Sequence, residues 1–290
     1  MRFRSGVLMA TVALAIAGVT GAAAEEKRKL RLGTDGTYAP FNYTDPSGEL
    51  VGFEPDIIAD LCPRIGVECE WVIQNFDGII PALNEGRFDA VMASLSITDE
   101  RAKAVDFSLP YYAGPTRFIA SAETDLGKLQ AGKGTTILLG TMSDEDKAVL
   151  EEVSTAFANA TVGVVRASTH AKFFEETFPG LSVKIYDKGE NMLLDLVAGR
   201  IDAAVDGAGS TLNFIGEQKK AGKDFVAVGP ALKGGALGKG IAFAFRKGED
   251  TDLREKVNEA IRDATTDGTL GSLSVKWIGV DGSISDNVNK

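Results

Sequence analysis

A short motif that occurs twice constrains the fold of this chain more than any other feature. Gly86-Arg87-Phe88-Asp89-Ala90-Val91 is repeated as Gly199-Arg200-Ile201-Asp202-Ala203-Ala204-Val205, and each copy follows an amphipathic helical segment and leads into an apolar strand. Small or polar residues follow each strand, Ser94-Leu95-Ser96 in one copy and Asp206-Gly207 in the other. Ligands of open parallel sheets bind beyond the carboxyl ends of the strands. The repeat therefore predicts two lobes that present equivalent sheet edges to one cleft, with chance similarity of short strings as the alternative.

Strand-like and helix-like segments alternate along the N-terminal part of the chain. Because strands that alternate with helices form right-handed parallel crossovers, we expect an α/β fold in which each lobe is a sheet flanked by helices. The expected strands are residues 29–33, 70–73 and 90–93, and the expected helices are residues 52–61, 76–84 and a segment that begins near Thr98.

Glycine and proline mark the expected passages between the lobes. The first passage is predicted at Tyr112-Ala113-Gly114-Pro115, before a strand at residues 117–121, and the return passage near Phe225 to Pro230. We therefore expect lobe 1 to be discontinuous and two strands to form a hinge between the lobes. The expected segments are residues 25–113 and 228–290 for lobe 1 and residues 114–227 for lobe 2.

The N-terminal residues have the pattern of a secretory signal peptide. Two arginines precede an apolar run at residues 7–19, and small residues precede a charged segment that begins at Glu25. An apolar core of this length is too short to span a bilayer, and no cysteine for a lipid anchor lies beside the cleavage site. We expect residues 1–24 to be removed by cleavage after Ala24 and the mature protein to be periplasmic.

The chain has two cysteines, Cys62 and Cys69. Because an exported protein meets an oxidising compartment, we expect them to form a disulfide, with two unpaired thiols as the alternative. Pro63 and Gly66 are expected to interrupt any helix between them. The bridge would then join the end of a helix to the strand that starts near Glu70.

Arg101 lies in the first turn of the helix expected near Thr98. A cation gains nothing from the positive end of a helix dipole, so the residue calls for another explanation. Free backbone N–H groups, two serine hydroxyls and a guanidinium in the run from Ser94 to Arg101 suit a carboxylate or a phosphate. The alternative is a solvated arginine that pairs with Asp99 or Asp106.

These motifs together resemble a known family. Over nearly all of residues 30–278 the chain is similar to periplasmic solute-binding proteins of polar amino-acid ABC importers (solute-binding protein family 3), in particular the lysine/arginine/ornithine- and histidine-binding type. The resemblance implies a two-lobed type II periplasmic binding protein fold, a monomer, an amino-acid ligand, the membrane permease of an ABC importer as partner, and no cofactor. The segments that carry it are Gly33-Thr34-Asp35-Gly36-Thr37-Tyr38-Ala39-Pro40-Phe41, Gly52-Phe53-Glu54-Pro55-Asp56, the Cys62/Cys69 pair, Phe76-Asp77-Gly78-Ile79-Ile80-Pro81, the run from Ser94 to Arg101, and Asp267-Gly268-Thr269.

The resemblance also implies roles for residues of lobe 1. Arg101, helped by Ser96, would bind the α-carboxylate of the ligand, which agrees with the charge-assisted bonds that a guanidinium makes. Asp35 would meet a cation on the ligand's side chain, although such an aspartate is also a common turn residue. Tyr38 and Phe76 would flank the aliphatic part of the ligand, with a core position as the alternative for each.

Two further contacts are implied on either side of the cleft. The backbone carbonyl of Ser94 would receive the ligand's ammonium, and Ala93 lacks a hydroxyl that the family often has there. In lobe 2, the family has a loop whose N–H groups and hydroxyl close over the carboxylate. We predict that this loop is residues 140–144 and that Ser143 supplies the hydroxyl, with Thr141 as the alternative.

The chain departs from the family where the ligand's amine is expected. The aspartate that binds the ammonium usually stands five residues after the aspartate of the second repeat, a position held here by Gly207, whereas Asp206 stands four residues after Asp202. Neighbouring strand residues point to opposite faces. Either the strand bulges and brings Asp206 into the cleft, or the site suits an N-substituted amino acid such as an opine, with space left by Gly207 and Gly209.

Charge favours a basic ligand and argues against other partners. Arg101 would offset the carboxylate and Asp35 a distal cation, and an unpaired buried aspartate would be costly beside an acidic ligand. The net charge of −10 at pH 7 argues against nucleic acid as a partner.

A dehydratase-like enzyme on the same scaffold and a sensory binding module are the alternative functions. His170 is expected on the surface, and no catalytic triad or metal-binding spacing is evident.

Overall fold

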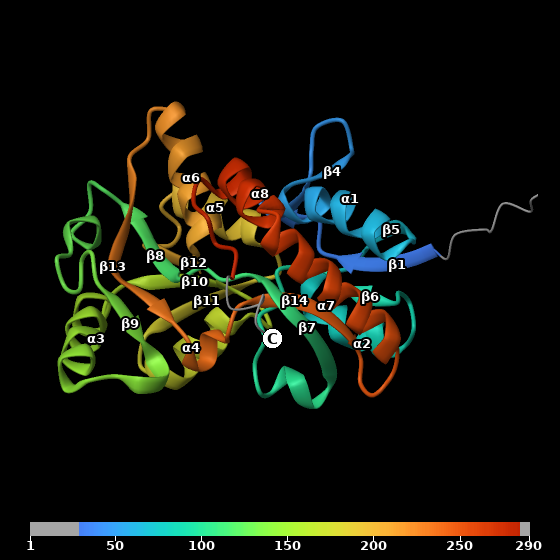
Figure 1. Cartoon of the computed structure of the whole chain (residues 1–290). Coiled ribbons are helices and arrows are strands. Elements are labelled where there is room, and N and C mark those ends of the chain that lie inside the picture. Colours follow the sequence, from blue (N-terminus) through green and yellow to red (C-terminus); the bar gives the residue numbers. More distant parts are fainter. Residues whose placement is uncertain (1–28, 285–290) are drawn as a thin grey trace, which may run out of the picture.

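Two large β-sheets, one in each lobe, organise residues 29–284, the part of the chain that the computed structural model describes (Figure 1). The predicted signal peptide lies outside these residues. Lobe 1, on the right of Figure 1, has the strand order β5-β1-β6-β14-β7, and lobe 2 has the order β11-β10-β12-β8-β13-β9. The α/β prediction with a sheet in each lobe is confirmed.

Lobe 1 combines a five-stranded sheet, a small three-stranded sheet and four helices. Its large sheet contains β1 (Lys29–Thr34), β5 (Glu68–Ile73), β6 (Ala90–Val91), β7 (Val105–Tyr112) and β14 (Ile241–Arg246). The small sheet contains β2 (Thr37–Tyr38), β3 (Asn42–Thr44) and β4 (Leu50–Val51). The helices are α1 (Phe53–Ile65), α2 (Ile79–Asn84), α7 (Thr251–Thr266) and α8 (Thr269–Ile278), with short 3₁₀ turns η1 (Phe76–Gly78) and η2 (Arg101–Lys103).

Lobe 2 is built on a six-stranded sheet. The sheet contains β8 (Thr116–Ser121), β9 (Thr136–Leu138), β10 (Thr161–Val165), β11 (Ser182–Tyr186), β12 (Ala203–Gly207) and β13 (Phe225–Lys233). The helices are α3 (Asp144–Ala156), α4 (Thr169–Thr177), α5 (Gly189–Val197) and α6 (Ala208–Lys220), with 3₁₀ turns η3 (Leu126–Lys128), η4 (Leu139–Thr141) and η5 (Gly235–Leu237).

The two copies of the sequence motif occupy equivalent places in the lobes. β6 pairs in parallel with β1, and β12 pairs in parallel with β10. Gly86 and Gly199, which follow α2 and α5, both adopt a positive φ, a conformation that glycine enters at little cost. The loops after β1 and β6 in lobe 1 therefore correspond to the loops after β10 and β12 in lobe 2.

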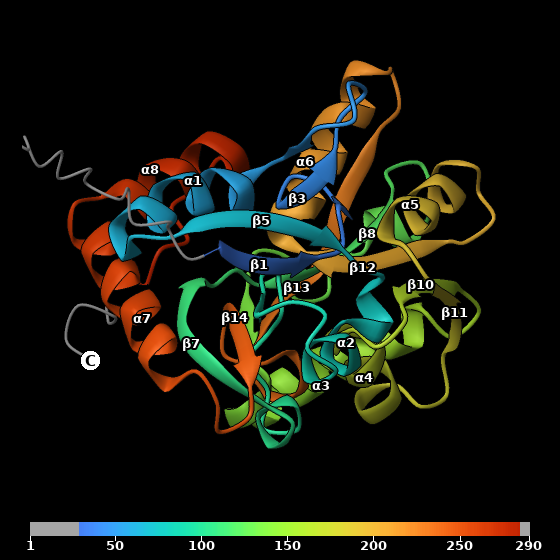
Figure 2. The ribbon, with the colours of Figure 1, turned by 90° about the vertical axis from the view of Figure 1, so that its right-hand side faces the viewer.

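Apolar side chains fill both faces of each sheet. In lobe 1, α1, α7 and α8 cover one face and α2 covers the other, as Figure 2 shows. In lobe 2, α3 and α4 pack against one face through residues such as Val153 and Phe173, while α5 and α6 pack against the other through Met192 and Phe214. Each lobe thus has its own core, and the polar loops at the strand ends are left to form the cleft.

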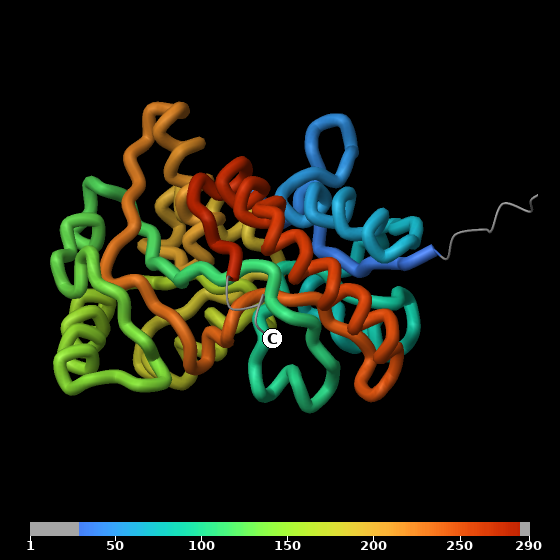
Figure 3. Tube along the Cα trace, viewed as in Figure 1, coloured from blue at the N-terminus to red at the C-terminus, as the bar shows by residue number. Residues whose placement is uncertain are grey.

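The return passage between the lobes lies later in the chain than the sequence suggested. β13 stays hydrogen-bonded to β8 and β9 as far as Lys233, so residues 228–233 belong to the sheet of lobe 2. The chain re-enters lobe 1 at β14, and the first passage lies between Tyr112 and Thr116 (Figure 3, green and orange). The apolar run at Phe225 misled the prediction because burial in either sheet produces the same pattern. Residues 234–240 instead include four glycines with positive φ.

Two local predictions for lobe 1 need correction. Pro63 does not end its helix, because α1 continues to Ile65 and ends at Gly66, which adopts the left-handed conformation. The predicted disulfide is confirmed between Cys62 in α1 and Cys69 in β5, with their Cα atoms 6.2 Å apart. The helix expected near Thr98 is only the three-residue turn η2. Among residues 29–284, none of the helices is long and apolar enough to cross a membrane.

Candidate ligand-binding site

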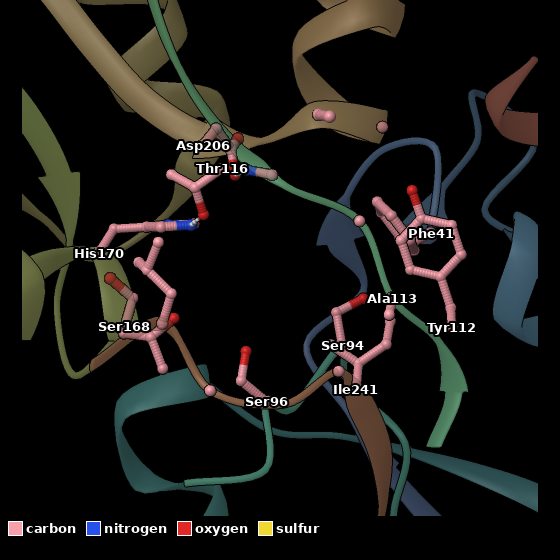
Figure 4. A pocket seen from close by; sticks show the side chains of 18 of the residues that line it. Phe41, Ser94, Ser96, Tyr112, Ala113, Thr116, Ser168, His170, Asp206 and Ile241 are labelled. Carbon is pink, nitrogen blue, oxygen red and sulfur yellow. Dashed lines mark hydrogen bonds between the residues drawn. The ribbon is translucent and has the colours of Figure 1, made fainter. Parts of the chain in front are cut away.

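A cavity of about 380 Å³ lies between the two lobes and is lined by residues from both. Figure 4 shows Asp206, Thr116, His170 and Ser168 from lobe 2 on one side and Ser94, Tyr112 and Ile241 from lobe 1 on the other. Residues 232–234 and 237–241, around the return passage, complete the lining. The structure brings seven of the eight predicted ligand residues to this cavity: Asp35, Tyr38, Phe76, Ser94, Ser96, Arg101 and Asp206.

Arg101 reaches across the cleft without meeting a carboxylate of the described residues. Its guanidinium donates to the carbonyl oxygen of Ser96 at 3.1 Å and to that of Ala167 in lobe 2 at 3.0 Å, and it lies 5.7 Å from the centre of the Phe76 ring. No ion pair of Arg101 is present within residues 29–284. Burial lowers the pKa of Arg101 to about 10, so the side chain is a cation at neutral pH. A guanidinium has five N–H donors, which leaves several for an anion in the cavity.

The two carboxylates that the alternative interpretation would pair with Arg101 have other partners. Asp99 pairs with Lys239, and Asp106 pairs with Lys247 and Arg254. The reason for placing Arg101 at an anion site also changes, because a turn of three residues has little dipole. A desolvated cation that has no counter-charge in the described part of the chain is the feature that indicates an anion ligand.

Asp35 is the corresponding anionic group of lobe 1. Burial raises the pKa of Asp35, while a hydrogen bond from the Thr37 hydroxyl and the more distant charge of Lys188 act in the opposite direction. No cation of residues 29–284 forms an ion pair with Asp35. The cavity therefore contains a cation and a carboxylate that the described part of the protein leaves without ion-pair partners.

Lobe 2 presents the start of helix α4 to the cavity. Ser168 caps this helix by accepting a hydrogen bond from the Ala171 N–H, and Ser168, Thr169 and His170 all line the cavity. The preceding residue, Ala167, has a φ of 57°, which is strained for a residue with a Cβ. Its carbonyl receives the Arg101 bond, so the guanidinium and the first turn of α4 meet at one place.

Asp206 is buried, with 3 % of its surface exposed, and lies at the end of β12. Its carboxylate accepts hydrogen bonds from the Tyr38 hydroxyl of lobe 1 at 2.7 Å, from the Gly207 N–H at 2.8 Å and from the Ser210 hydroxyl at 2.8 Å. Burial and the nearby carboxylate hold the pKa of Tyr38 well above its usual value. The Tyr38 bond and the Arg101 bond to Ala167 both connect the lobes.

The register of β12 shows whether this strand needs a bulge to bring Asp206 into the cleft, which the sequence left open. β12 pairs with β8 without a shift from Ala203 to Gly207, so no bulge is needed to bring Asp206 to the cavity. A Cβ on Gly207 would lie 3.1 Å from the Tyr38 hydroxyl oxygen. Gly207 therefore leaves the room in which Tyr38 reaches Asp206.

Comparison with known proteins identifies the family of this fold and cleft. The profile of "Bacterial extracellular solute-binding proteins, family 3" matches residues 30–280. The chain belongs to this family. It is 33 % identical over 282 residues to the octopine-binding periplasmic protein of Rhizobium meliloti, covering 91 % of this chain and 94 % of that one. It is 34 % identical over 278 residues to the histidine-binding periplasmic protein of Salmonella typhimurium, covering 94 % and 96 %.

The fold of a solved structure agrees with this assignment. An ancestral arginine-binding protein bound to arginine superposes with a TM-score of 0.71 at 31 % identity, covering 88 % of this chain and 100 % of the other. The predicted resemblance to solute-binding protein family 3 and the two-lobed type II fold are thereby confirmed.

Ser143 lies away from the cavity of this family 3 protein. It caps the exposed start of α3, where Ser143 and Asp146 form a reciprocal capping box. Thr141, the alternative, is in η4 and does not line the cavity either. The prediction failed because the loop after β9, an edge strand, and the loop after β10 both end in a serine that starts a helix. Of β9 and β10, it is β10 that lies beside β12, and the residues that follow β10 line the cavity.

His170 was expected at the surface but lines the cavity. One of its ring nitrogens, Nε2, lies 3.2 Å from the Thr116 hydroxyl oxygen. Burial lowers the pKa of His170, the Asp206 charge raises it and the Arg101 charge lowers it further. The sequence motif itself could have located Ser168, Thr169 and His170, since they lie just beyond β10, as Asp35 lies just beyond the equivalent strand β1.

The geometry of the site suits a small zwitterion that carries an additional charge. Aromatic rings of Tyr38, Phe41 and Tyr112 form an apolar wall, in which Tyr38 stacks on Phe41 at a centroid distance of 5.2 Å. The polar groups of Arg101, Asp35 and α4 stand around it. Within residues 29–284, no cluster of histidine, cysteine, aspartate and glutamate has the arrangement of a metal site.

Proposed function

We propose that this family 3 protein binds a basic amino acid, or an N-substituted derivative such as an opine, in the cavity between its lobes. The observation that carries this proposal is the pair of opposite charges, Arg101 and Asp35, which face one cavity without ion-pair partners in the described residues. An α-carboxylate satisfies Arg101, and a side-chain cation satisfies Asp35. Each bond to a charged group contributes about 1.5 to 3 kcal/mol.

The carboxylate of the ligand is held from both lobes in this proposal. Arg101 supplies a guanidinium from lobe 1, with Ser96 beside it, and the Ser168 hydroxyl and the N–H groups at the start of α4 supply donors from lobe 2. Charge-assisted bonds of this kind are among the strongest in proteins. Phe76 and Tyr38 then lie along the aliphatic part of the ligand, as the family resemblance implies.

The amine end admits two ligand types. The Ser94 carbonyl accepts from the amine, and Asp206 provides negative charge while it keeps its three bonds from Tyr38, Gly207 and Ser210. Because glycine replaces the usual aspartate at position 207, the amine meets no carboxylate from that position, and a secondary amine is accepted as well as a primary one. The octopine-binding and histidine-binding relatives support one type each.

Ligand binding is coupled to delivery by closure of the lobes. A ligand that touches Arg101 and α4 together gains contacts that exist only in the closed state, and this shifts the population towards closure. We propose that the mature protein acts as a periplasmic monomer, that residues 1–24 are removed on export, and that the permease of an ABC importer recognises the closed form. Intact mass of the protein from a periplasmic extract tests the cleavage, since the expected first residue is Glu25.

Binding without turnover is the expected outcome at this site. Catalysis would require a free acid or base beside the ligand. Asp35, His170 and Asp206 are the candidates, and all three are hydrogen-bonded to neighbouring side chains. Incubation with prephenate and with the bound amino acid, followed by chromatography, should show unchanged substrate, and formation of a product would support the dehydratase-like alternative.

Calorimetric titration of the purified mature protein tests the proposed ligand. We expect saturable binding of at least one among lysine, arginine, ornithine, histidine and octopine, with no binding of glutamate at the same concentration. A binding isotherm with glutamate, or the absence of binding by the whole basic panel, would contradict the proposal. Octopine and arginine compared in one experiment show which amine type the site prefers.

A further inference from the structure

Glu54 is a carboxylate with no exposed surface, buried under the cavity floor of lobe 1. It does not line the cavity, and no ion pair of Glu54 is present among residues 29–284. Burying an ionised group without a cation is costly, and replacing it by an apolar side chain often stabilises a protein. Such a residue calls for a reason other than core packing.

Four donors surround the Glu54 carboxylate. One oxygen accepts from the Ser94 N–H at 2.7 Å, the Ser94 hydroxyl at 2.8 Å and the Tyr111 hydroxyl at 2.5 Å. The other oxygen accepts from the Asn42 amide at 2.7 Å. Burial raises the pKa of Glu54, and these hydrogen bonds act in the opposite direction by stabilising its charged form.

The four donors belong to three residues, and each of these residues is connected to a different part of the cavity wall. Ser94 lines the cavity and has a φ of 50°, a strained conformation for a residue that is not glycine. The side-chain oxygen of Asn42 accepts from the Gly36 N–H at 2.9 Å, next to Asp35. Tyr111 precedes Tyr112, which packs edge-on against Phe41 in the apolar wall.

We infer that Glu54 is a positioning residue for ligand recognition: one buried carboxylate sets the Ser94 carbonyl, the Asp35 loop and the aromatic wall of lobe 1 in a fixed arrangement. The Ser94 N–H and hydroxyl require an acceptor on one side of residue 54. The Asn42 amide requires an acceptor on the other side. Only a carboxylate offers acceptors on both sides without donors of its own.

The orientation of Asn42 makes this requirement testable. Because the Gly36 N–H fixes the Asn42 oxygen, the Asn42 NH₂ must point at Glu54. In Glu54→Gln the glutamine oxygen is needed by Ser94, so its NH₂ faces the NH₂ of Asn42, and both of these donors are left without an acceptor. Adding Asn42→Asp removes the conflict, because an aspartate accepts from both the Gly36 N–H and the glutamine NH₂. The double variant moves the negative charge from position 54 to position 42 and restores every hydrogen bond.

The experiment compares arginine with citrulline, its neutral analogue of nearly the same shape, and rests on the proposed function for its ligands. In the parent protein arginine should bind more tightly than citrulline because of Asp35. In Glu54→Gln we expect this preference to fall about tenfold, since the loop of Asp35 loses its support, and in Asn42→Asp/Glu54→Gln we expect it to recover. An unchanged preference in Glu54→Gln, or a double variant that regains thermal stability but not the preference, would overturn the inference.

Two controls separate positioning from general stability and from failure of the ligand assignment. Asp89→Asn removes another carboxylate of lobe 1, which is bonded to Arg31 away from the cavity, and should lower thermal stability without changing the arginine preference. Hydrogen exchange of the Gly36 amide in the ligand-free protein gives a measurement that does not depend on any ligand. Faster exchange in Glu54→Gln and recovery in the double variant support the role of Glu54 even if no basic ligand binds the parent. Unchanged exchange refutes it.

Discussion

Lobe 1 brings to the cleft an arginine and an aspartate that form no ion pair within residues 29–284, whereas lobe 2 brings a helix start, a histidine and a carboxylate that already accepts three hydrogen bonds. The sheets behind these groups have equivalent strand orders around β1 and β10. The difference lies in what supports the loops. Ser94 and the Asp35 loop are tied to a buried carboxylate, while the loop before α4 is held by its own helix cap.

From this contrast we infer different roles for the two lobes, ligand discrimination in lobe 1 and closure in lobe 2. Charged groups that form no ion pair within the described residues discriminate between ligands, because an unsuitable ligand leaves a desolvated charge without a partner. Neutral donors at a helix start discriminate less and serve closure. We therefore expect substitutions in lobe 1 to change which ligand binds, and substitutions in lobe 2 to change how tightly the lobes close.

Removing the lobe 1 cation should have the largest effect. Arg101→Ala deletes the guanidinium that faces the carboxylate, and at about 1.5 to 3 kcal/mol per charged hydrogen bond the loss of two bonds weakens binding by at least a hundredfold. Calorimetric titration with arginine measures the change. Arg87→Ala, which removes an exposed arginine of the same lobe, is the matched control. Equal affinity of the Arg101 variant and the parent would exclude the carboxylate assignment.

The lobe 1 anion should set ligand charge preference. In Asp35→Asn we expect arginine to bind about tenfold to a hundredfold more weakly and citrulline to bind nearly as before. Asp45→Asn, in an exposed turn of the same lobe, should change neither value. A parallel loss for both ligands would show that Asp35 shapes its loop and does not meet the cation.

The same residue predicts a dependence on pH. Burial raises the pKa of Asp35 in the free protein, and a bound cation favours its ionised form. Affinity for arginine should therefore be complete above the raised pKa and fall as the pH drops through it. Titration between neutral pH and pH 4 should show this decline in the parent and a smaller one in Asp35→Asn. Identical profiles would place the titrating group elsewhere.

The sequence predicted lobe 1 better than lobe 2 for a physical reason. Asp35, Ser96 and Arg101 follow local strand patterns that also mark the family, although the helix dipole argued for Arg101 does not exist in a three-residue turn. In lobe 2, Ser143 and Ser168 are both helix caps, and local pattern cannot show which strand is at an edge. That depends on pairing between distant segments.

Long-range contacts also explain the other differences. The passage at residues 234–240 could not be located because a buried apolar strand has the same sequence pattern in either sheet. The hydrogen bonds of Glu54 join it to residues 12, 40 and 57 positions away in the sequence, so no local spacing predicts them. The repeated motif did predict the paired sheets, because it encodes a complete helix and strand unit in each lobe.

The contact between the lobes should have a moderate effect. Tyr38→Phe removes the hydroxyl that bonds Asp206, and Asp206 keeps its bonds from Gly207 and Ser210. The loss of one bond that forms only on closure should weaken binding by about fivefold, or about 1 kcal/mol. Small-angle scattering with saturating ligand measures closure through the radius of gyration, which should be larger for Tyr38→Phe than for the parent. Tyr43→Phe, outside the cavity, is the control, and an unchanged affinity for Tyr38→Phe would deny the bond a role in closure.

The smallest effect distinguishes two serines of lobe 2 that have the same local role. Ser143 caps α3 and Ser168 caps α4, so alanine at either position should cost about 1 kcal/mol of stability. Only Ser168 lines the cavity, and Ser168→Ala should also weaken ligand binding about two- to fivefold because one hydroxyl donor is lost. Thermal melts and titrations of both variants measure the two effects separately. If Ser143→Ala weakened binding as much as Ser168→Ala, the loss would come from the stability of lobe 2, and the loop before α4 would have no direct part in recognition.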